Sequence, residues 1–502
     1  MNMKQTTGIE SGVIGGKWIL PGLVVVLLIM RFASLGAYPL MDTTEARYAE
    51  IGREMVISGD WVTPTLNKKP FWAKPPLSFW LTAASLRVFG NSEFAARIPH
   101  FLISLLTMAL TFTLACRMFG RQTAWLSVLI LLTSGLFYAT MALVMTDETL
   151  AFTVTLALAA FFLSIHSERR ASRLVWGYTF FAGLGLSLLA KGPVGAVLIL
   201  LPIGAWTLLH RRWREVAHAL PLFSGMLLML AISVPWYVLA EMRTPGFLHY
   251  FLIGEHLQRY LVPGWKGDQF GNAHEHIRGT IWLYGLIATL PWGILFLSVL
   301  RRMKWHPRQA FANSDMAFLI CWFLAPLVFF TLAGNIIITY VLPGLPAMAV
   351  LFAAALIRSA ESISDYRAFW PIRRAALGVS TLFFPLLFSI ASLFVLPEVG
   401  KRKSDKDFLE YVRGDENLRR ADLIYFEKMP YSSAFYSQGS ARLLTEEQSE
   451  TVRQEFENDP DDLFVVRRKD LNEFQQIVGD NIRHVGSYGD YLLLTSRHSR
   501  IP

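Results

Sequence analysis

Long apolar runs recur along the first 400 residues of this chain, and they constrain its fold more than any other feature. A run of roughly 20 residues is enough for a helix to cross about 30 Å of hydrocarbon. With 53% hydrophobic and 17% charged residues, the chain is also too apolar for a soluble protein of 502 residues. The sequence therefore predicts an α-helical polytopic membrane protein. Its expected spans, about eleven, centre on residues 18–36, 98–116, 122–141, 149–165, 174–190, 193–209, 219–240, 279–300, 316–333, 340–357 and 375–397.

One further stretch, residues 76–90, is amphipathic and too short for a full crossing. We expect it to form an interfacial or re-entrant helix. With one or two half-spans of this kind, the total comes to about 11 to 13 transmembrane helices.

The basic residues predict how the chain is oriented in the membrane. Loops rich in Lys and Arg resist translocation and stay in the cytoplasm. Such loops occur at every second connection, at residues 117–121, 168–173, 210–214, 301–308 and 358–374. The N-terminus is then cytoplasmic, and the net charge of +9 reflects these loops rather than a nucleic-acid-binding surface. The outer side receives residues 38–75, 145–148, 191–193, 241–278, 334–339 and everything after about 399.

Residues 399–502 differ in character from residues 1–398, because short strand-like runs alternate there with polar stretches that suit helices. We therefore expect a membrane domain over 1–398, with a first external loop at 38–75, and a small external α/β domain over 399–502. The tail carries no nucleophile motif, metal-ligand spacing or Gly-rich phosphate loop, which predicts a supporting role. The strand-like runs are 422–426, 462–467 and 490–496, and the helix-compatible stretches include 445–457 and 470–479.

The first external loop carries the densest group of polar residues. Asp42 precedes a stretch of good helix formers and Glu45 follows three residues later, so the two carboxylates share one face of the expected helix. A capping box at the membrane surface would explain this pair without any chemistry. Alternatively, the acidic pair, followed at once by Arg47 and Tyr48, can transfer protons or orient a sugar hydroxyl.

Lys74 follows two aromatic residues and precedes two prolines, Pro75 and Pro76, which stiffen the backbone. The ordinary interpretation is a lysine whose charge reaches the membrane interface beside an aromatic belt. The functional alternative is a fixed cation for a lipid phosphate headgroup, because a rigid mount lowers the ordering cost of binding.

Charged residues also flank later spans. Asp147 opens one span, where an acid suits a helix N-terminus. Lys191 stands before Gly192 and Pro193 between two apolar runs, and ionisable groups at such depth usually have a role. A divalent metal in the loop 241–278 is a further hypothesis, although its spacings match no strong zinc signature. The candidate ligands would be Glu255, His256, His274 and His276.

Several motifs together resemble a known family. The chain reads P-x-x-D-x-x-E-A-R-Y-A-E-I-x-R-E-M, G-D-W-x-x-P, K-P-P-L-x-x-W, T-D, K-G, E-H-x-x-R-Y, L-P-W and T-Y-V-L-P, in this order over about residues 39–355. This series resembles the bacterial lipid-carrier-dependent glycosyltransferases, which are the aminoarabinose transferases of lipid A and their relatives, distantly akin to protein O-mannosyltransferases. The resemblance implies a C-type glycosyltransferase fold, a periplasmic active site and a polyprenyl-phosphate-linked sugar as donor.

The resemblance also implies roles for individual residues. Lys74 matches the lysine expected to bind the carrier phosphate, Glu45 the acid of the first-loop motif, and Asp147 the acid that opens a later span. With Asp42, these two acids are the expected catalytic residues. The expected substrate-binding residues are Arg47, Tyr48, Lys74, Lys191, His256, Arg259 and Tyr340.

Three positions depart from the family pattern. The aminoarabinose enzymes usually have an aspartate directly before the first-loop glutamate, where this chain has Thr44, so Asp42 must serve from two residues further upstream. The acid before the K-P lysine, implicated in metal contact in the family, is Ala73 here. A lysine expected shortly before the T-Y element is missing from residues 334–338. The sugar or the acceptor can therefore differ from aminoarabinose and lipid A.

The expected function is that of a multi-pass glycosyltransferase of the bacterial inner membrane, with its active site and C-terminal domain in the periplasm. It would move a sugar from undecaprenyl phosphate to lipid A or lipopolysaccharide, with no required cofactor and no nucleic-acid partner. Lys74 and Arg259, with help from Lys191 and Tyr340, would hold the carrier phosphate. Asp42, with Glu45 or Asp147, would orient or deprotonate the acceptor for a single displacement, and the resemblance implies that it inverts the anomeric carbon. Within the enzyme class, the alternative is glycosylation of protein hydroxyls or of a core sugar.

Two other classes of protein remain to be distinguished. A lipid-linked sugar transporter or flippase would also carry intramembrane charges, but it should show inverted halves, and no such symmetry is visible in the sequence. A membrane-anchored binding protein would place its polar residues mainly in the tail. Here they cluster in loops between spans, which favours an enzyme.

Overall fold

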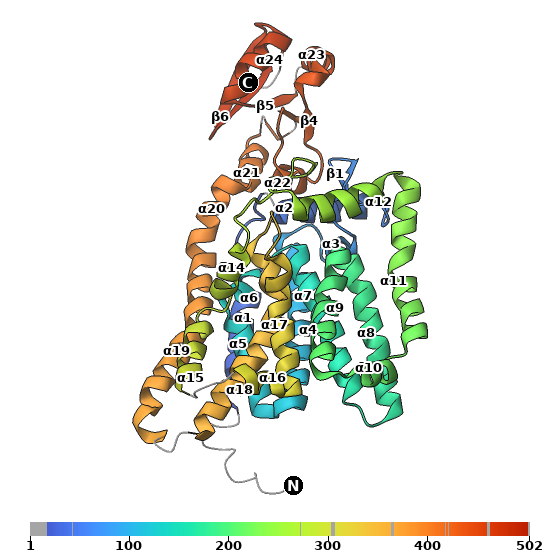
Figure 1. The fold of residues 1–502 in the computed structure, drawn as a ribbon. Helices are drawn as coiled ribbons and strands as arrows, with labels where there is room; N and C mark the ends of the chain where they lie inside the picture. The colour runs from blue at the N-terminus through green and yellow to red at the C-terminus, as the bar shows by residue number, and fades with distance from the viewer. Residues whose placement is uncertain are drawn as a thin grey trace.

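The computed structural model describes residues 18–42, 44–271, 273–302, 307–362, 366–416, 418–419, 421–458 and 462–499. Its larger part is a bundle of helices, and a small domain containing a sheet lies at one end of that bundle (Figure 1). Within the described residues, seven helical segments are long and apolar enough to cross a membrane: Glu93–Phe119, Thr146–Ile165, Arg170–Lys191, Pro193–His210, Leu222–Arg243, Ile338–Arg358 and Gly378–Lys403.

All eleven apolar runs expected to span the membrane are helical in the structure, which confirms a helical membrane protein. The long segments lie in α4 (Glu93–Phe119), α7 (Thr146–Ile165), α8 (Arg170–Lys191), α9 (Pro193–His210), α11 (Leu222–Arg243), η2 (Ile338–Gly344) with most of α18 (Leu345–Ser362), and the second half of α19 (Tyr366–Ile390) with the helical residues that follow it. The other runs form the shorter helices α1 (Ile19–Ala33), α5 (Arg121–Thr133) with α6 (Gly135–Thr140), α14 (Thr280–Ala288) with α15 (Trp292–Arg302), and α17 (Ser314–Phe330). The number of complete crossings stays a prediction.

The shorter helices have local causes. Ser134 adopts an extended conformation and separates α5 from α6. Pro291 stands between α14 and α15, and a proline cannot donate the backbone hydrogen bond that would continue a helix. Residues 76–90 form α3 (Leu77–Phe89), whose 13 residues are too few for a full crossing.

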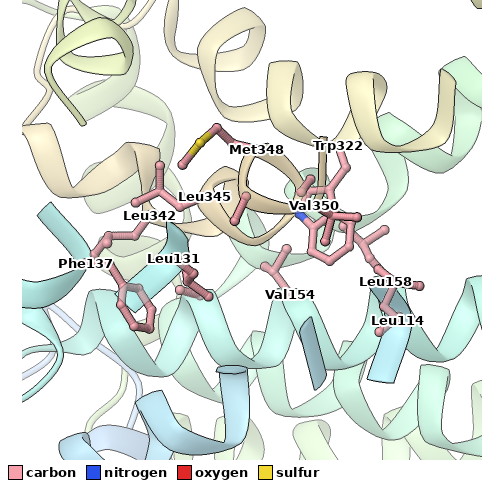
Figure 2. Packing of buried hydrophobic residues seen from close by; sticks show 14 of the residues in the cluster. Leu114, Leu131, Phe137, Val154, Leu158, Trp322, Leu342, Leu345, Met348 and Val350 are labelled. Atoms are coloured by element: carbon pink, nitrogen blue, oxygen red, sulfur yellow. The ribbon is translucent and has the colours of Figure 1, made fainter. Parts of the chain in front are cut away.

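The core of the bundle surrounds α7. This helix is apolar on all sides after its first turn. In its most hydrophobic stretch of 18 residues, 83% of the residues are buried, against 17% in the corresponding stretch of α11 at the periphery. Figure 2 shows Leu131 of α5, Val154 of α7 and Val350 of α18 among the side chains that fill the space between these helices. Trp322 is also buried there and donates a hydrogen bond of 2.7 Å to the carbonyl of Pro343.

The connections between the helices fall at two opposite ends of the bundle (Figure 1). The basic connections that the structure describes in full, at residues 117–121, 168–173 and 210–214, reach one end, where α10 (Trp213–Ala219) and α16 (Pro307–Ala312) lie. The opposite end holds α2 (Glu45–Ser58), the hairpin of β1 (Thr65–Leu66) and β2 (Lys69–Pro70), and the transverse segment of α12 (Phe247–His249), η1 (Tyr250–Gln258) and α13 (Arg259–Leu261). This separation is the one expected from the basic loops, while the side of the membrane that each end faces stays a prediction.

The C-terminal domain is an α/β domain built on a five-stranded sheet with the strand order β4-β3-β5-β7-β6. β3 is parallel to β4 and β5, whereas β7 is antiparallel to β5 and β6. The strand-like runs expected from the sequence correspond to β3, β5 and β7, and the helix-compatible stretches to α23 and α24. The elements are α21 (Lys406–Gly414), β3 (Leu423–Phe426), α22 (Tyr431–Tyr436), β4 (Arg442–Leu444), η4 (Glu446–Gln448), α23 (Ser449–Asn458), β5 (Leu463–Arg467), η5 (Arg468–Asp470), α24 (Leu471–Val478), β6 (Ile482–Tyr488) and β7 (Tyr491–Ser496).

The membrane and C-terminal domains are joined by a continuous helical segment. α19 passes without a break into the π-helix η3 (Ala391–Val395) and then into α20 (Leu396–Lys403). In Figure 1 this segment runs along one edge of the bundle and ends at the C-terminal domain. The helix therefore extends beyond residue 398, where we expected the membrane domain to end.

Candidate functional site

Two adjoining cavities lie at the end of the bundle that carries the first loop. One, the apolar cavity, has a volume of about 610 Å³ and is lined mainly by side chains of α9, η1 and α13, such as Val194, Val197 and Leu257. The other, the polar chamber, has a volume of about 680 Å³ and is lined by the first loop, the ends of several helices and the C-terminal domain. Five residues line both cavities and define their junction: Ala73, Lys74, Lys191, Arg259 and Tyr340.

Lys74 and Arg259 meet at the junction through one carboxylate. The Nζ atom of Lys74 lies 3.2 Å from Oε2 of Glu255, and a guanidinium nitrogen of Arg259 lies 3.0 Å from the same oxygen. Tyr250 donates a hydrogen bond of 3.0 Å to the other oxygen of Glu255, and Asp268 accepts a second bond of 2.9 Å from Arg259. Burial opposes ionisation of Glu255, but the charges of Lys74 and Arg259 outweigh it and hold the pKa of this carboxyl below its ordinary value.

Lys191 reaches the junction from the end of α8. Its ammonium lies 2.5 Å from Oδ1 of Asp147 at the start of α7, and 4.3 Å from the centre of the Tyr340 ring. The chain turns sharply after Lys191, because Gly192 has φ +76° and Pro193 begins α9. The K-G-P sequence thus fixes both a cation and a turn at the junction.

His256 supports this turn. Its ring nitrogens lie 2.7 Å from the carbonyl oxygen of Phe251 and 3.1 Å from that of Lys191. His256 and Glu255 both lie in η1, a π-helix, and such segments often mark functional sites.

Glu45 lies next to the polar chamber but is not among its lining residues. Arg97, which is fully buried in α4, forms two hydrogen bonds to the carboxylate of Glu45, at 3.0 and 2.8 Å. The same guanidinium donates to the carbonyls of Leu35, Tyr38 and Pro39, just before the first loop. This network holds the start of α2 against α4.

Asp42 lines the polar chamber and contacts the C-terminal domain. Its carboxylate accepts hydrogen bonds from the hydroxyl and the backbone N–H of Ser432, and its own N–H donates a bond of 2.8 Å to the carbonyl of Lys403. Burial raises the pKa of Asp42 to about 6; the bonds from Ser432 lower it, and the neighbouring charge of Asp405 raises it. Asp42 is therefore protonated more easily than an exposed aspartate.

Arg47 and Tyr48 also line the polar chamber. Arg47 donates a hydrogen bond to the carbonyl of Phe270 and lies 5.8 Å from the ring centre of Tyr431. Tyr48 packs edge-on against Phe79, with ring centres 5.4 Å apart. The structure thus brings all but one of the expected site residues to the two cavities; the exception is Glu45.

The residues proposed as metal ligands do not form a metal site. Glu255 is engaged by two cations, both nitrogens of His256 face carbonyl oxygens, and Nε2 of His276 lies 3.1 Å from the hydroxyl of Tyr284. His274 lines the polar chamber, where burial and nearby Arg259 lower its pKa. Over the part of the chain that the structure describes, no group of three or more His, Cys, Asp or Glu side chains is arranged to hold a metal ion.

The sequence did not predict the contribution of the C-terminal domain. Its residues form a wall of the polar chamber, and Asp405 lies there with hydrogen bonds from Tyr425, Ser433 and Tyr491. The sequence offered no signal for this, since these polar residues follow no recognisable spacing. The lining residues from this part of the chain are Arg402, Lys403, Ser404, Asp405, Glu427, Lys428, Met429, Pro430, Tyr431, Leu443 and Tyr491.

The chain is similar to known membrane glycosyltransferases. The family model of the dolichyl-phosphate-mannose-protein mannosyltransferases matches residues 18–251. The undecaprenyl phosphate-alpha-4-amino-4-deoxy-L-arabinose arabinosyl transferase of Aeromonas hydrophila is 30% identical, over 67% of this chain and 59% of that protein. The enzyme of the same name from Erwinia tasmaniensis is 31% identical, over 62% of this chain and 55% of that protein. The matches therefore span less than two thirds of the length of these curated relatives.

The fold is also found among solved structures. The crystal structure of ArnT from Cupriavidus metallidurans bound to undecaprenyl phosphate superimposes with a TM-score of 0.81 and 23% identity, over 96% of this chain and 98% of that one. The apo form of the same protein gives a TM-score of 0.78 and 24% identity. This likeness confirms the C-type glycosyltransferase fold. The chain is thus similar, in sequence and in fold, to the lipid-carrier-dependent glycosyltransferases, the family that contains the aminoarabinose transferases.

Proposed function

We propose that this protein transfers a sugar from an undecaprenyl phosphate carrier to an acceptor at the periplasmic face of the inner membrane. The acceptor we favour is lipid A or lipopolysaccharide, since the curated relatives are named as undecaprenyl phosphate aminoarabinose transferases. The observation that carries the proposal is the junction of an apolar cavity with a polar chamber at three cations, Lys74, Lys191 and Arg259.

This arrangement suits a lipid-linked sugar. The isoprenoid chain would lie in the apolar cavity, whose volume of about 610 Å³ accommodates several isoprene units rather than the whole carrier. The phosphate would lie at the junction, near Lys74 and Arg259, with Lys191 and Tyr340 beside it. The sugar would then enter the polar chamber, where carboxylates and hydroxyls can bind it.

The junction can stabilise a phosphate as a leaving group. Glu255 and Asp147 hold the three cations in place before the substrate arrives, so little reorganisation is needed when negative charge develops on the phosphate. Transfer would break the bond between the anomeric carbon and the phosphate oxygen while the acceptor oxygen forms its bond to that carbon. The electron pair of the broken bond would remain on the carrier phosphate.

The three acids expected to be catalytic receive different roles in this proposal. Asp42, with a pKa of about 6 and a place in the polar chamber, would orient the acceptor or take its proton. Asp147 would position Lys191, and Glu45 would position the first loop through Arg97. If the acceptor is itself a phosphate, Asp42 would serve mainly to orient it, because no strong base is then needed.

The proposed orientation in the membrane rests on the basic loops. They gather at the end of the bundle away from both cavities, and Lys- and Arg-rich loops remain cytoplasmic. We therefore propose a cytoplasmic N-terminus, with the chamber and the C-terminal domain in the periplasm.

The proposal is tested with the full-length protein reconstituted in liposomes, given undecaprenyl phosphate-linked aminoarabinose as donor and lipid A as acceptor. Mass spectrometry should show modified lipid A with the native protein and with Lys266→Ala, an exposed cation of the same loop that lines neither cavity. Lys74→Ala and Arg259→Ala should lose at least about 100-fold in rate.

Other outcomes would assign another function. Movement of labelled carrier lipid between leaflets without chemical change would identify a flippase and refute transfer. Mass spectrometry of lipid A, core oligosaccharide and glycoproteins from a strain lacking this protein identifies the acceptor. Loss of a sugar from glycoproteins or from the core alone would replace lipid A by that acceptor.

A further inference from the structure

The carboxylate of Asp42 is held by a residue of the C-terminal domain that lies 390 positions away in the sequence. Ser432 is fully buried and donates to both oxygens of Asp42, one bond from its hydroxyl and one, of 3.2 Å, from its backbone N–H. The backbone N–H of the preceding Tyr431 also contributes a hydrogen bond, and the hydroxyl of Ser432 is the only side-chain donor to that carboxylate among the described residues. Its orientation in the polar chamber thus depends on Ser432.

The direction of the hydroxyl hydrogen of Ser432 is fixed by its surroundings. The backbone N–H of Asp405 donates a bond of 3.0 Å to Oγ of Ser432. Since that oxygen already accepts this bond, its own hydrogen is available to point at Asp42. The result is a chain of donors that runs from Asp405 through Ser432 and ends at the carboxylate of Asp42.

The helix that carries Ser432, α22, is built into the membrane side of the molecule. Phe435 is buried in the same cluster as Tyr48 and Phe79 of the first loop and α3. The hydroxyl of Tyr436 accepts a bond of 2.7 Å from the N–H of Leu40 and donates one of 2.9 Å to Glu93. These contacts fix Ser432 relative to the first loop.

We propose that Ser432 is a positioning residue for the transfer reaction, which orients the carboxylate of Asp42 and keeps it ionised. The C-terminal domain then completes the active site rather than merely covering it. This inference rests on the proposed function, in which Asp42 is the acid or base of the polar chamber. A hydrogen bond to the charged form of a carboxyl lowers its pKa, so Ser432 acts against burial and against the negative charge of Asp405.

Other charged and titratable groups around the chamber act on Asp42 as well, so the test must separate Ser432 from them. The charged and titratable residues that line the chamber with Asp42 are Arg47, Tyr48, Lys74, Asp147, Lys191, Arg259, Asp268, His274, Tyr340, Arg402, Lys403, Asp405, Glu427, Lys428, Tyr431 and Tyr491.

The test is the pH dependence of the transfer rate for the reconstituted full-length protein. Ser432→Ala should move the acidic limb of the profile to higher pH by roughly one pH unit, because Asp42 is then protonated more easily. Near pH 6 the rate should fall about fivefold, and it should recover at higher pH. KM for the donor should change less than twofold, since the junction that holds its phosphate is untouched.

The matched control is Ser437→Ala. Ser437 is also buried in this domain, but its hydroxyl donates only to the carbonyl of Ala434, 3.2 Å away. This variant should keep the native pH profile even if it is less stable. Ser432→Thr, which retains a hydroxyl, should restore the native profile. An unshifted acidic limb in Ser432→Ala would overturn the inference.

A second substitution covers the case in which Ser432→Ala does not fold. Ser432→Cys replaces the hydroxyl by a weaker donor and should shift the acidic limb upward, while Ser432→Thr should not. Identical profiles for Cys and Thr would overturn the inference. Absence of transfer by the native protein would instead refute the proposed function, so the two failures are distinct.

Discussion

The ammonium of Lys191 lies 2.5 Å from the carboxylate of Asp147, and both side chains are almost completely buried. Removing one partner of such a pair leaves an uncompensated charge. We expect Asp147→Asn to lower the free energy of unfolding by about 3 kcal/mol, and the double variant with Lys191→Met to lower it by less than the sum of the single effects. Thermal unfolding of the detergent-purified protein measures both quantities. Asp315→Asn, which alters a half-exposed acid, serves as control.

Glu45 and Asp42 should respond differently to loss of charge. Glu45→Gln disrupts the buried, two-bond contact with Arg97, and we expect it to destabilise the protein by about 3 kcal/mol. Asp42→Asn keeps only one of the two oxygens that accept from Ser432, so stability should fall by about 1 kcal/mol, less than in Glu45→Gln, while transfer falls at least about 100-fold. Unfolding and rate measurements on both variants would contradict these roles if Glu45→Gln were stable and Asp42→Asn active.

Stability should depend on pH through Glu255. Its folded-state pKa lies below the ordinary value, because Lys74 and Arg259 outweigh the effect of burial. Ionised Glu255 therefore stabilises the folded protein fully at pH values above the ordinary pKa of a glutamate. This contribution is lost as the pH falls through the lowered pKa of the folded state. Between about pH 7 and pH 3, the native protein should lose more thermal stability than Glu255→Gln. Glu398→Gln, in an exposed ion pair, should behave like the native protein.

Gly192 should not tolerate a side chain. A Cβ atom there would lie 2.7 Å from the ring of Phe251 and 2.9 Å from Nε2 of His256, in a backbone conformation with φ +76°. We expect Gly192→Ala to destabilise the protein by about 2 kcal/mol and to weaken donor binding by displacing His256 from Lys191. Gly204→Ala in α9, where nothing lies within 4 Å, is the control and should retain native binding in a titration with undecaprenyl phosphate.

Transfer should not require a divalent metal. Ala73 stands where the family has an acid, and the acids of the junction already have cationic partners in Lys74, Lys191 and Arg259. We expect reconstituted protein to keep its full rate in excess EDTA and to gain less than twofold from added Mg²⁺, Mn²⁺ or Zn²⁺. A rate that EDTA abolishes and one of these ions restores would contradict this.

The membrane domain was predictable from the sequence because apolar runs of sufficient length form helices in any topology. The positions at which these helices break were not predictable from hydropathy. Pro291 is visible in the sequence, yet the run around it is apolar throughout, so it was expected as one span at 279–300 rather than as the two helices α14 and α15. Burial, and not hydropathy, distinguishes the central α7 from the peripheral α11.

The candidate site was predictable where a local motif carries the residue. The K-P-P, K-G-P and E-H-x-x-R motifs supplied Lys74, Lys191 and Arg259, and these three cations meet in the structure. The partner of Glu45 was not predictable, because Arg97 lies 52 residues away, directly before an expected span, and no local motif links the two residues. Ser432 was not predictable either, because it lies 390 residues from Asp42 and a serine in a polar tail has no distinctive sequence pattern.

The continuous helix from α19 to α20 limits how the C-terminal domain can move relative to the bundle. At 1.5 Å per residue this rod is roughly 55 Å long, and its last residue, Lys403, is hydrogen-bonded to the first loop through Asp42. A domain joined by such a helix cannot move as freely as one joined by a flexible linker. Any movement of the C-terminal domain away from the first loop would therefore have to bend or tilt this helix and break its contact with Asp42.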